Sequence, residues 1–186
     1  MENTEYIELY EPGGYHPVEL GDKFSNRYVV EHKLGYGGYS TVWLARDLRQ
    51  KRLVALKIIM ADPDDGDGCL GDGDGCLETA ILRRLGSRPQ TSCQQWLWNE
   101  SPFRSSSGDR PQPSFFPALL DEFTIHGPNG DHRCLVTEVL GPSICLADDY
   151  EEPYMLPLGV AKKIAVQLAH AVAELHECGI VHGGTY

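Results

Sequence analysis

The chain has no run of eighteen apolar residues that could cross a membrane, and no apolar core of the signal-peptide type follows its acidic start. Its six cysteines include no C-x-x-C pair and stand in no histidine cluster of the kind that binds zinc. It also has no basic stripe, since 27 Asp and Glu against 16 Lys and Arg give a formal net charge of −11. We therefore expect a protein of the cytoplasm or nucleus, with reduced thiols and with neither a metal site nor a membrane or nucleic-acid partner.

Much of the acidity is concentrated in one segment. Residues 61–78 hold seven of the acidic residues and no Lys or Arg, and they include the consecutive heptapeptides DDGDGCL and GDGDGCL. The alternation of Asp and Gly suggests calcium, but the spacing of an EF-hand loop and its terminal bidentate Glu are missing, so we predict a flexible acidic linker. A second disordered insertion is predicted downstream of Gly86, rich in Ser, Pro, Arg and Gln; it contains Trp96 and Trp98, whose indoles could dock on a partner.

A glycine-rich turn and a lysine on a later strand make residues 34–57 the most informative stretch of the chain. Residues 28–34 and 41–45 have the composition of strands, and the glycines between them predict a tight turn and hence a hairpin. Because glycine has no Cβ, backbone N–H groups at such a turn can approach the oxygens of a triphosphate. A further apolar strand is predicted at 54–59, and its single charge, Lys57, needs a partner if it is buried. The turn glycines are Gly35, Gly37 and Gly38.

Two amphipathic helices and a second pair of strands are predicted downstream. Apolar residues at helical spacing, closed by Gly86, predict the first helix, with Glu78 in its first turn. Residues 116–126 and 132–141 predict two strands on either side of a Gly-Pro-Asn-Gly-Asp turn. Apolar residues recur at helical spacing again from 158 to 178, which predicts a long amphipathic helix.

The order of these features carries a resemblance. The pattern L-G-x-G-x-Y-S-x-V-x-x-A followed by V-A-L-K resembles the glycine loop and third-strand lysine of eukaryotic protein kinases, with Ser40 where the third glycine of the loop usually stands. The resemblance implies an α+β fold: a kinase N-terminal lobe of antiparallel sheet plus αC helix, a hinge, and the first helices of an incomplete C-terminal lobe. It also makes Glu78 the αC glutamate that forms an ion pair with Lys57.

The resemblance further implies an ATP site. Thr137 takes the gatekeeper position, and the Glu138 carbonyl and the Leu140 backbone would face the adenine edge. The apolar side chains of Leu34, Val42 and Ala55 would sandwich the adenine ring. The alternative for these three residues is that they belong to the hydrophobic core. The implied ATP-binding residues are Leu34, Gly35, Gly37, Gly38, Val42, Ala55, Lys57, Thr137, Glu138 and Leu140.

Within the kinases, the segment YEPGGYHPV at residues 10–18 looks like the lead-in of SR-protein-specific kinases and their fungal relatives. The hinge letters E-V-L-G at 138–141 and V-H-G at 181–183 are similar to the same group. Members phosphorylate serines in Arg/Ser-rich proteins, which is the implied substrate class. The predicted organisation is a lead-in at 1–27, a small lobe at 28–140 with insertions at about 61–76 and 87–114, and a hinge exit with the start of a large lobe at 141–186.

The pattern then departs from that of an active kinase. Gly184 occupies the position of the catalytic aspartate, and no Asp-Phe-Gly triplet or catalytic-loop asparagine is present to hold the magnesium ions expected for the family. A glycine cannot accept a hydroxyl proton, so we expect no complete catalytic set and no appreciable phosphoryl transfer. Asp148 and Asp149 read as helix-capping residues rather than replacement metal ligands. Two alternatives stay open: a pseudokinase-like interaction module, and a truncated gene-model product without independent function.

Overall fold

The computed structural model describes residues 5–61, 77–87, 115–141 and 156–181. It divides into two units, Met1–Ala80 with Ala118–Leu140, and Ile81–Pro117 with Gly141–Tyr186. The predicted insertions, Asp148, Asp149 and Gly184 lie outside the described residues. The described elements are η1 (Ile7–Leu9), β1 (Lys23–Phe24), β2 (Tyr28–Gly37), β3 (Ser40–Asp47), β4 (Arg52–Ile59), α1 (Leu77–Gly86), β5 (Leu119–Gly127), β6 (Gly130–Thr137) and α3 (Leu158–Glu177).

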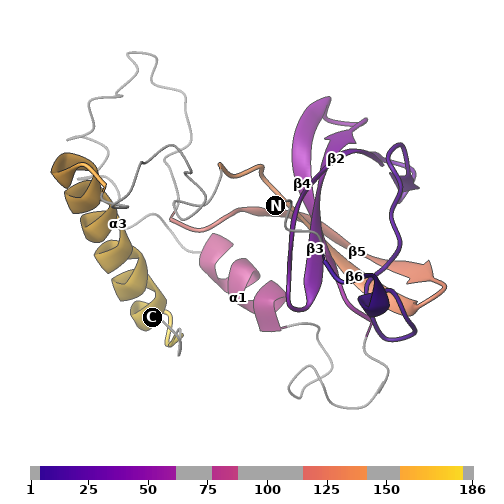
Figure 1. Ribbon diagram of the computed structural model, residues 1–186. Coiled ribbons are helices and arrows are strands. Elements are labelled where there is room, and N and C mark those ends of the chain that lie inside the picture. Colours follow the sequence, from indigo (N-terminus) through magenta and orange to yellow (C-terminus); the bar gives the residue numbers. More distant parts are fainter. Residues whose placement is uncertain (1–4, 62–76, 88–114, 142–155, 182–186) are drawn as a thin grey trace. The chain divides into compact units, whose positions relative to one another are not determined.

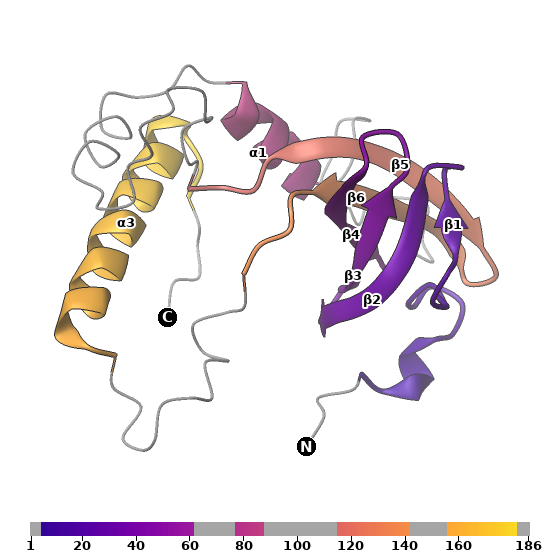
Figure 2. The same ribbon diagram turned by 90° about the horizontal axis from the view of Figure 1, so that it is seen from above.

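The first unit is built on an antiparallel sheet. Its six described strands lie in the order β1-β2-β3-β4-β6-β5, and every neighbouring pair is antiparallel (Figure 1). The sheet curves strongly, as Figure 2 shows from above. Three strands separate β2 from β5 in the sheet order, yet Tyr28 of β2 stacks on Phe123 of β5 with ring centroids 5.6 Å apart. The predicted antiparallel sheet is confirmed, and the predicted helix, α1, lies between β4 and β5 in chain order.

Two-residue alternation divides the strands into a core face and a second face. The core face carries Trp43 and Ala45 of β3, Val54, Leu56 and Ile58 of β4, and Cys134 and Val136 of β6, all of them buried in one hydrophobic cluster. Register pairs such as Trp43 with Leu56, and Leu56 with Val136, show that these side chains lie on the same side of the sheet. The intervening residues, Lys57 among them, must point to the opposite side.

The predicted hairpin is formed by β2 and β3, but its turn is shorter than expected. Gly37 pairs with Ser40, which leaves a two-residue turn of Gly38 and Tyr39. Gly35 and Gly37 lie inside β2, because that strand continues past a register irregularity between Lys33 and Gly35. The expectation that all three glycines belong to the turn is wrong for these two.

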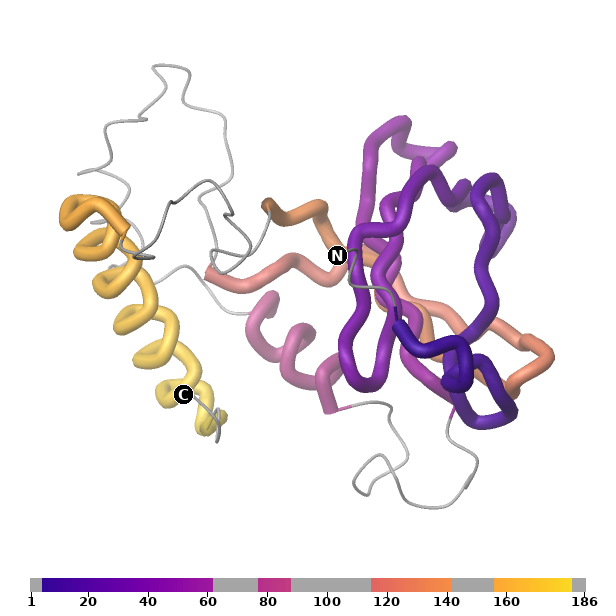
Figure 3. Tube along the Cα trace, viewed as in Figure 1, coloured from indigo at the N-terminus to yellow at the C-terminus, as the bar shows by residue number. Residues whose placement is uncertain are grey.

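The N-terminal segment before β2 packs against the sheet. Figure 3 follows it past the β5–β6 turn, where the Gly13 N–H donates to the carbonyl of Asn129 at 2.8 Å. Tyr15 and His16 are both buried, and the His16 ring lies against the His132 ring with centroids 4.8 Å apart. A Cβ at Gly127 would meet His16 Nδ1 at 2.4 Å, so the close packing of this histidine requires a glycine there.

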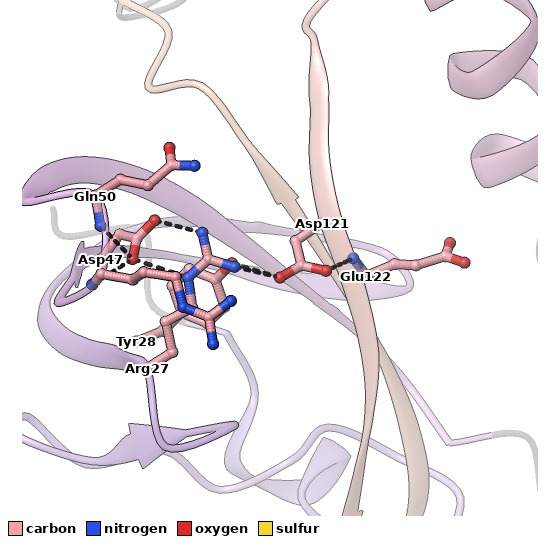
Figure 4. Close-up of polar contacts among 7 residues, drawn as sticks. Arg27, Tyr28, Asp47, Gln50, Asp121 and Glu122 are labelled. Carbon is pink, nitrogen blue, oxygen red and sulfur yellow. Dashed lines mark hydrogen bonds and ion pairs between the residues drawn. The ribbon is translucent and has the colours of Figure 1, made fainter.

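An ion-pair network joins the start of β2 to the end of β3 and to β5, which the curvature of the sheet brings close together. Arg27 donates from Nε and Nη2 to both carboxylate oxygens of Asp47, at 2.8 and 2.7 Å, and from Nη1 to Asp121 Oδ2 at 2.8 Å (Figure 4). The Tyr28 hydroxyl donates to the same Asp121 oxygen at 2.7 Å. The Arg27 guanidinium lowers the pKa of the buried Asp47 carboxyl below its ordinary value.

The second unit contains the predicted long helix, which begins at Leu158 and ends at Glu177. Its C-terminus has a Schellman motif, in which the Ile180 N–H donates to the Leu175 carbonyl and the Gly179 N–H to the His176 carbonyl, both at 2.9 Å. Gly179 has φ +69°, which glycine adopts without the cost of a Cβ clash. Leu175 is buried and Leu168 is exposed. No helix in the described ranges has both the length and the apolar character needed to span a membrane.

Candidate functional site

An ion pair joins β4 to the first turn of α1. Lys57 Nζ lies 2.7 Å from both Oε1 and Oε2 of Glu78. The side chains remain 33% and 39% exposed, so the pair is open to solvent on the second face of the sheet. Lys57 reaches that face because its neighbours Leu56 and Ile58 point into the core. Glu78 stands in the first helical turn, where the helix dipole favours an acid.

The sheet register places Lys57 in a row of residues that crosses four strands. Gly35 of β2 pairs with Val42 of β3, Val42 pairs with Lys57, and Lys57 pairs with Leu135 of β6. Directly opposed residues in antiparallel strands share a face, so Val42 and Leu135 lie beside the lysine. Val42 is half-buried and Leu135 is fully buried.

A second row lies two residues away on the same face. Ala55 pairs with Leu44 of β3 and with Thr137 of β6. Ala55 is buried, while Leu44 and Thr137 are half-buried. The two rows together form a small apolar floor with a single ammonium group at one end. Leu44 and Leu135 were missed as site residues, although counting two residues on from Val42 and two back from Thr137 would have found them.

The glycines next to this floor face open space. No heavy atom lies within 4 Å of a Cβ built on Gly35 or Gly38, and the first contact at Gly37 is Ser40 Oγ at 3.9 Å. None of the three has a positive φ. Neither backbone strain nor protein crowding therefore demands a glycine at these positions. Close approach of a bound group is a third reason for glycine, and these observations leave room for it.

The remaining predicted residues lie at the rim of the floor. Leu34 falls at the irregularity in β2 and is 45% exposed. Glu138 and Leu140 follow β6, and Leu140 is 60% exposed. The Glu138 carbonyl accepts a 3.2 Å bond from the Thr137 hydroxyl, and its Oε1 accepts one from the Ala118 N–H, also at 3.2 Å. Of the ten residues predicted to bind ATP, five lie in the two rows, Gly38 lies in the adjoining turn and Gly37 lies at the end of β2 beside that turn; the other three, Leu34, Glu138 and Leu140, lie at the rim.

Lys57 is the one charged residue in the two rows of the floor, and Glu78 is its partner. Nowhere in the described ranges do three His, Cys, Asp or Glu side chains gather in a way that could hold a metal ion. The floor is therefore suited to a ligand that has a flat apolar part for the row of Ala55 and an anionic part for Lys57.

Comparison with known proteins gives a consistent result over almost the whole chain. No protein-family model matches it. It is 37% identical over 182 residues to protein kinase dsk1 of Schizosaccharomyces pombe, 35% identical over 187 residues to SRSF protein kinase 3 of Homo sapiens, and 33% identical over 182 residues to serine/threonine-protein kinase SKY1 of Saccharomyces cerevisiae. Each match covers 97% of this chain but only 29%, 28% and 22% of the relative.

Together with these relatives, the antiparallel sheet, the helix inserted between β4 and β5 and the lysine–glutamate pair between sheet and helix define the N-terminal lobe of a protein kinase. The chain spans less than a third of the length of each of these curated relatives, so it corresponds to a part of such a protein. Within the kinases, it is an SRPK-like sequence, as its lead-in and hinge letters predict.

Proposed function

We propose that this chain is the ATP-binding portion of an SRPK-type serine/threonine protein kinase. The observation that carries the proposal is the Lys57–Glu78 ion pair, which stands at one end of an apolar sheet face. In protein kinases the corresponding lysine contacts the α- and β-phosphates, and the glutamate holds its ammonium in place. A lysine held at two oxygens has little freedom left to lose when a phosphate arrives.

The described residues fit the two ends of ATP. Val42 and Ala55 offer apolar surface to a base, with Leu34 at the rim, and Lys57 offers a cation to the phosphates. The open space at Gly35 and Gly38 lets backbone N–H groups come close to phosphate oxygens. When bound, ATP supplies the phosphoryl group that kinases transfer; the side chains described here bind and orient.

For the complete protein, we propose phosphoryl transfer to serine or threonine in Arg/Ser-rich proteins of the cytoplasm or nucleus. For the 186-residue chain by itself, we propose binding without transfer, because Gly184 stands where the catalytic aspartate is expected. The family uses Mg²⁺ with ATP. The described residues offer no cluster of His, Cys, Asp or Glu for that ion.

A thermal-shift titration of the 186-residue chain with ATP, with and without Mg²⁺, tests the binding step. A ligand at a hundred times its Kd stabilises the folded state by about 2.7 kcal/mol, which is an easily measured rise in Tm. We expect a single cooperative transition that moves upward with ATP concentration. A transition that stays in place at millimolar ATP contradicts the proposal.

A further inference from the structure

The turn between β2 and β3 is held by a residue of the N-terminal segment. The Tyr15 hydroxyl donates a 2.6 Å hydrogen bond to the carbonyl of Gly37, which immediately precedes the turn. Tyr15 is only 1% exposed, so its ring is fixed by packing and its hydroxyl has one direction in which to point. The two residues are 22 positions apart in the chain, and Tyr15 is not one of the paired residues of β2 and β3 that form the hairpin.

Gly37 lies where the sheet offers little other support. β1 pairs with β2 only at Tyr28 and Val29, so within the described residues no strand lies on the outer side of β2 at Gly37. The other side of the turn is tied down by the sheet, because the Met60 N–H donates to the Tyr39 carbonyl at 3.0 Å. Tyr15 thus supplies a tether on the side that lacks one.

The backbone that carries Tyr15 is itself anchored at several points. The Asn129 side-chain amide donates to the Tyr15 carbonyl at 2.7 Å, and the Tyr15 N–H donates to the Leu9 carbonyl at the same distance. The Ala61 N–H donates to the Gly14 carbonyl at 3.1 Å. A Cβ at Gly14 would come within 2.0 Å of the Leu9 carbonyl oxygen, so only glycine permits this course of the chain. The hydroxyl is therefore presented from a fixed base.

We propose that Tyr15 is a positioning residue of the nucleotide site: it fixes the glycine turn in the place from which the turn contacts phosphate. The inference rests on the proposed ATP-binding function and adds a residue outside the glycine-loop and lysine motifs. Its physical basis is entropic. A glycine-rich turn has many accessible backbone states, and each state removed before binding lowers the ordering cost at binding.

The test compares two substitutions that each delete one hydroxyl from the same segment. Tyr15→Phe removes the bond to Gly37 and keeps the buried ring. Tyr10→Phe removes a hydroxyl that donates to Glu5 and leaves the ring that packs edge-on against Tyr15 at 5.6 Å. Calorimetric titration with ATP and with adenosine, on the 186-residue chain, measures each Kd. Melting curves without nucleotide measure the fold.

We expect Tyr15→Phe to raise the Kd for ATP about three- to tenfold, the usual range for one hydrogen bond, and to leave the Kd for adenosine within about twofold. Tyr10→Phe should change neither value. A Tyr15→Phe protein that binds ATP like the parent overturns the inference. Equal losses for ATP and adenosine, together with a lower Tm, also overturn it, because they indicate a merely structural role.

Failure of the underlying function looks different, since the unsubstituted chain would then bind neither ligand. If Tyr15→Phe melts too low for titration, Asn129→Asp provides the second test, because it removes the amide that anchors the Tyr15 carbonyl. A selective rise in the Kd for ATP supports the tether in that variant as well. An unchanged Kd for ATP overturns it.

Discussion

The ammonium nitrogen of Lys57 is equidistant from the two carboxylate oxygens of Glu78, 2.7 Å from each. Such a two-oxygen contact orients the lysine side chain more tightly than a single bond can. Both side chains are about a third exposed, and ion pairs in that environment add little to folding stability. We therefore expect the pair to matter more for the proposed binding of ATP than for the stability of the lobe.

Glu78→Ala should separate these two roles. We expect the free energy of unfolding to change by less than about 1 kcal/mol. The Kd for ATP should rise about tenfold, because Lys57 loses the group that orients it. Urea denaturation and calorimetric titration measure the two effects. Glu31→Ala is the matched control, since Glu31 forms a 2.6 Å ion pair with Arg46 and neither residue belongs to the two rows of the floor. Equal changes in ATP binding for both variants would refute the assignment.

Lys57→Met tests the cation itself. Methionine keeps most of the apolar stem and removes the charge that would contact phosphate, so the ATP-induced rise in Tm should disappear while a cooperative transition persists. Lys23→Met, at an exposed position of β1, removes the same charge elsewhere and should keep the full ATP response. Undiminished ATP affinity in Lys57→Met would remove the basis of the proposed function.

Asp47→Ala addresses the network that joins β2, β3 and β5. Asp47 is fully buried, and its carboxylate also accepts the backbone N–H groups of Arg49 and Gln50, at 2.9 and 3.1 Å. Removing it leaves Arg27 with Asp121 alone and leaves the two backbone donors without their acceptor, which we expect to cost about 3 kcal/mol of unfolding free energy. Asp131→Ala deletes an exposed acid paired with His126 and should cost less than about 0.5 kcal/mol. Denaturant titration at pH 7 that finds similar costs for the two would contradict this account.

The His16–His132 pair predicts a loss of stability in mild acid. Burial lowers the pKa of both imidazoles below their ordinary value of 6.5, although Asp22 near His16 and Asp131 near His132 act in the opposite direction. The unfolded chain takes up protons as the pH falls through 6.5 while the folded chain does not, so the unfolding free energy must fall from that pH downward until the lowered folded-state pKa values are reached.

Denaturant melts between pH 7.5 and 5 measure this slope. His132→Asn keeps a donor for the Ile59 carbonyl, which the Nδ1 atom now contacts at 3.0 Å, and removes one titrating group. Its slope should be shallower than that of the parent. A parent protein whose stability is flat over this range would show that the buried rings do not titrate as argued.

The local elements were predictable because their signals are local. The helix at 77–86 was bounded by its apolar spacing and its closing glycine, and the structure has it at Leu77–Gly86. The hairpin and the strand containing Lys57 followed from composition alone. Of the site, the positions of Lys57 and Glu78 came from the family resemblance, and the nucleotide roles of all ten predicted residues stay predictions.

The contacts that shape the lobe could not be predicted in the same way. Arg27 meets Asp121 across 94 positions of sequence, and Tyr15 meets Asn129 across 114. No periodicity links residues so far apart, since their meeting depends on how the whole sheet curves. The extension of β2 through Gly35 and Gly37 was missed for a related reason: pairing with β3 overrides the low strand preference of glycine.

The alternation of core residues with Lys57 along β4 couples correct folding to the correct position of the lysine. A slip of one residue against β3 would turn Leu56 and Ile58 outward and force the ammonium of Lys57 into the hydrophobic cluster. Such a chain would forfeit its core and its cation together. A molecule with this register error would therefore not fold stably. Molecules that unfold cooperatively should all present Lys57 on the second face of the sheet.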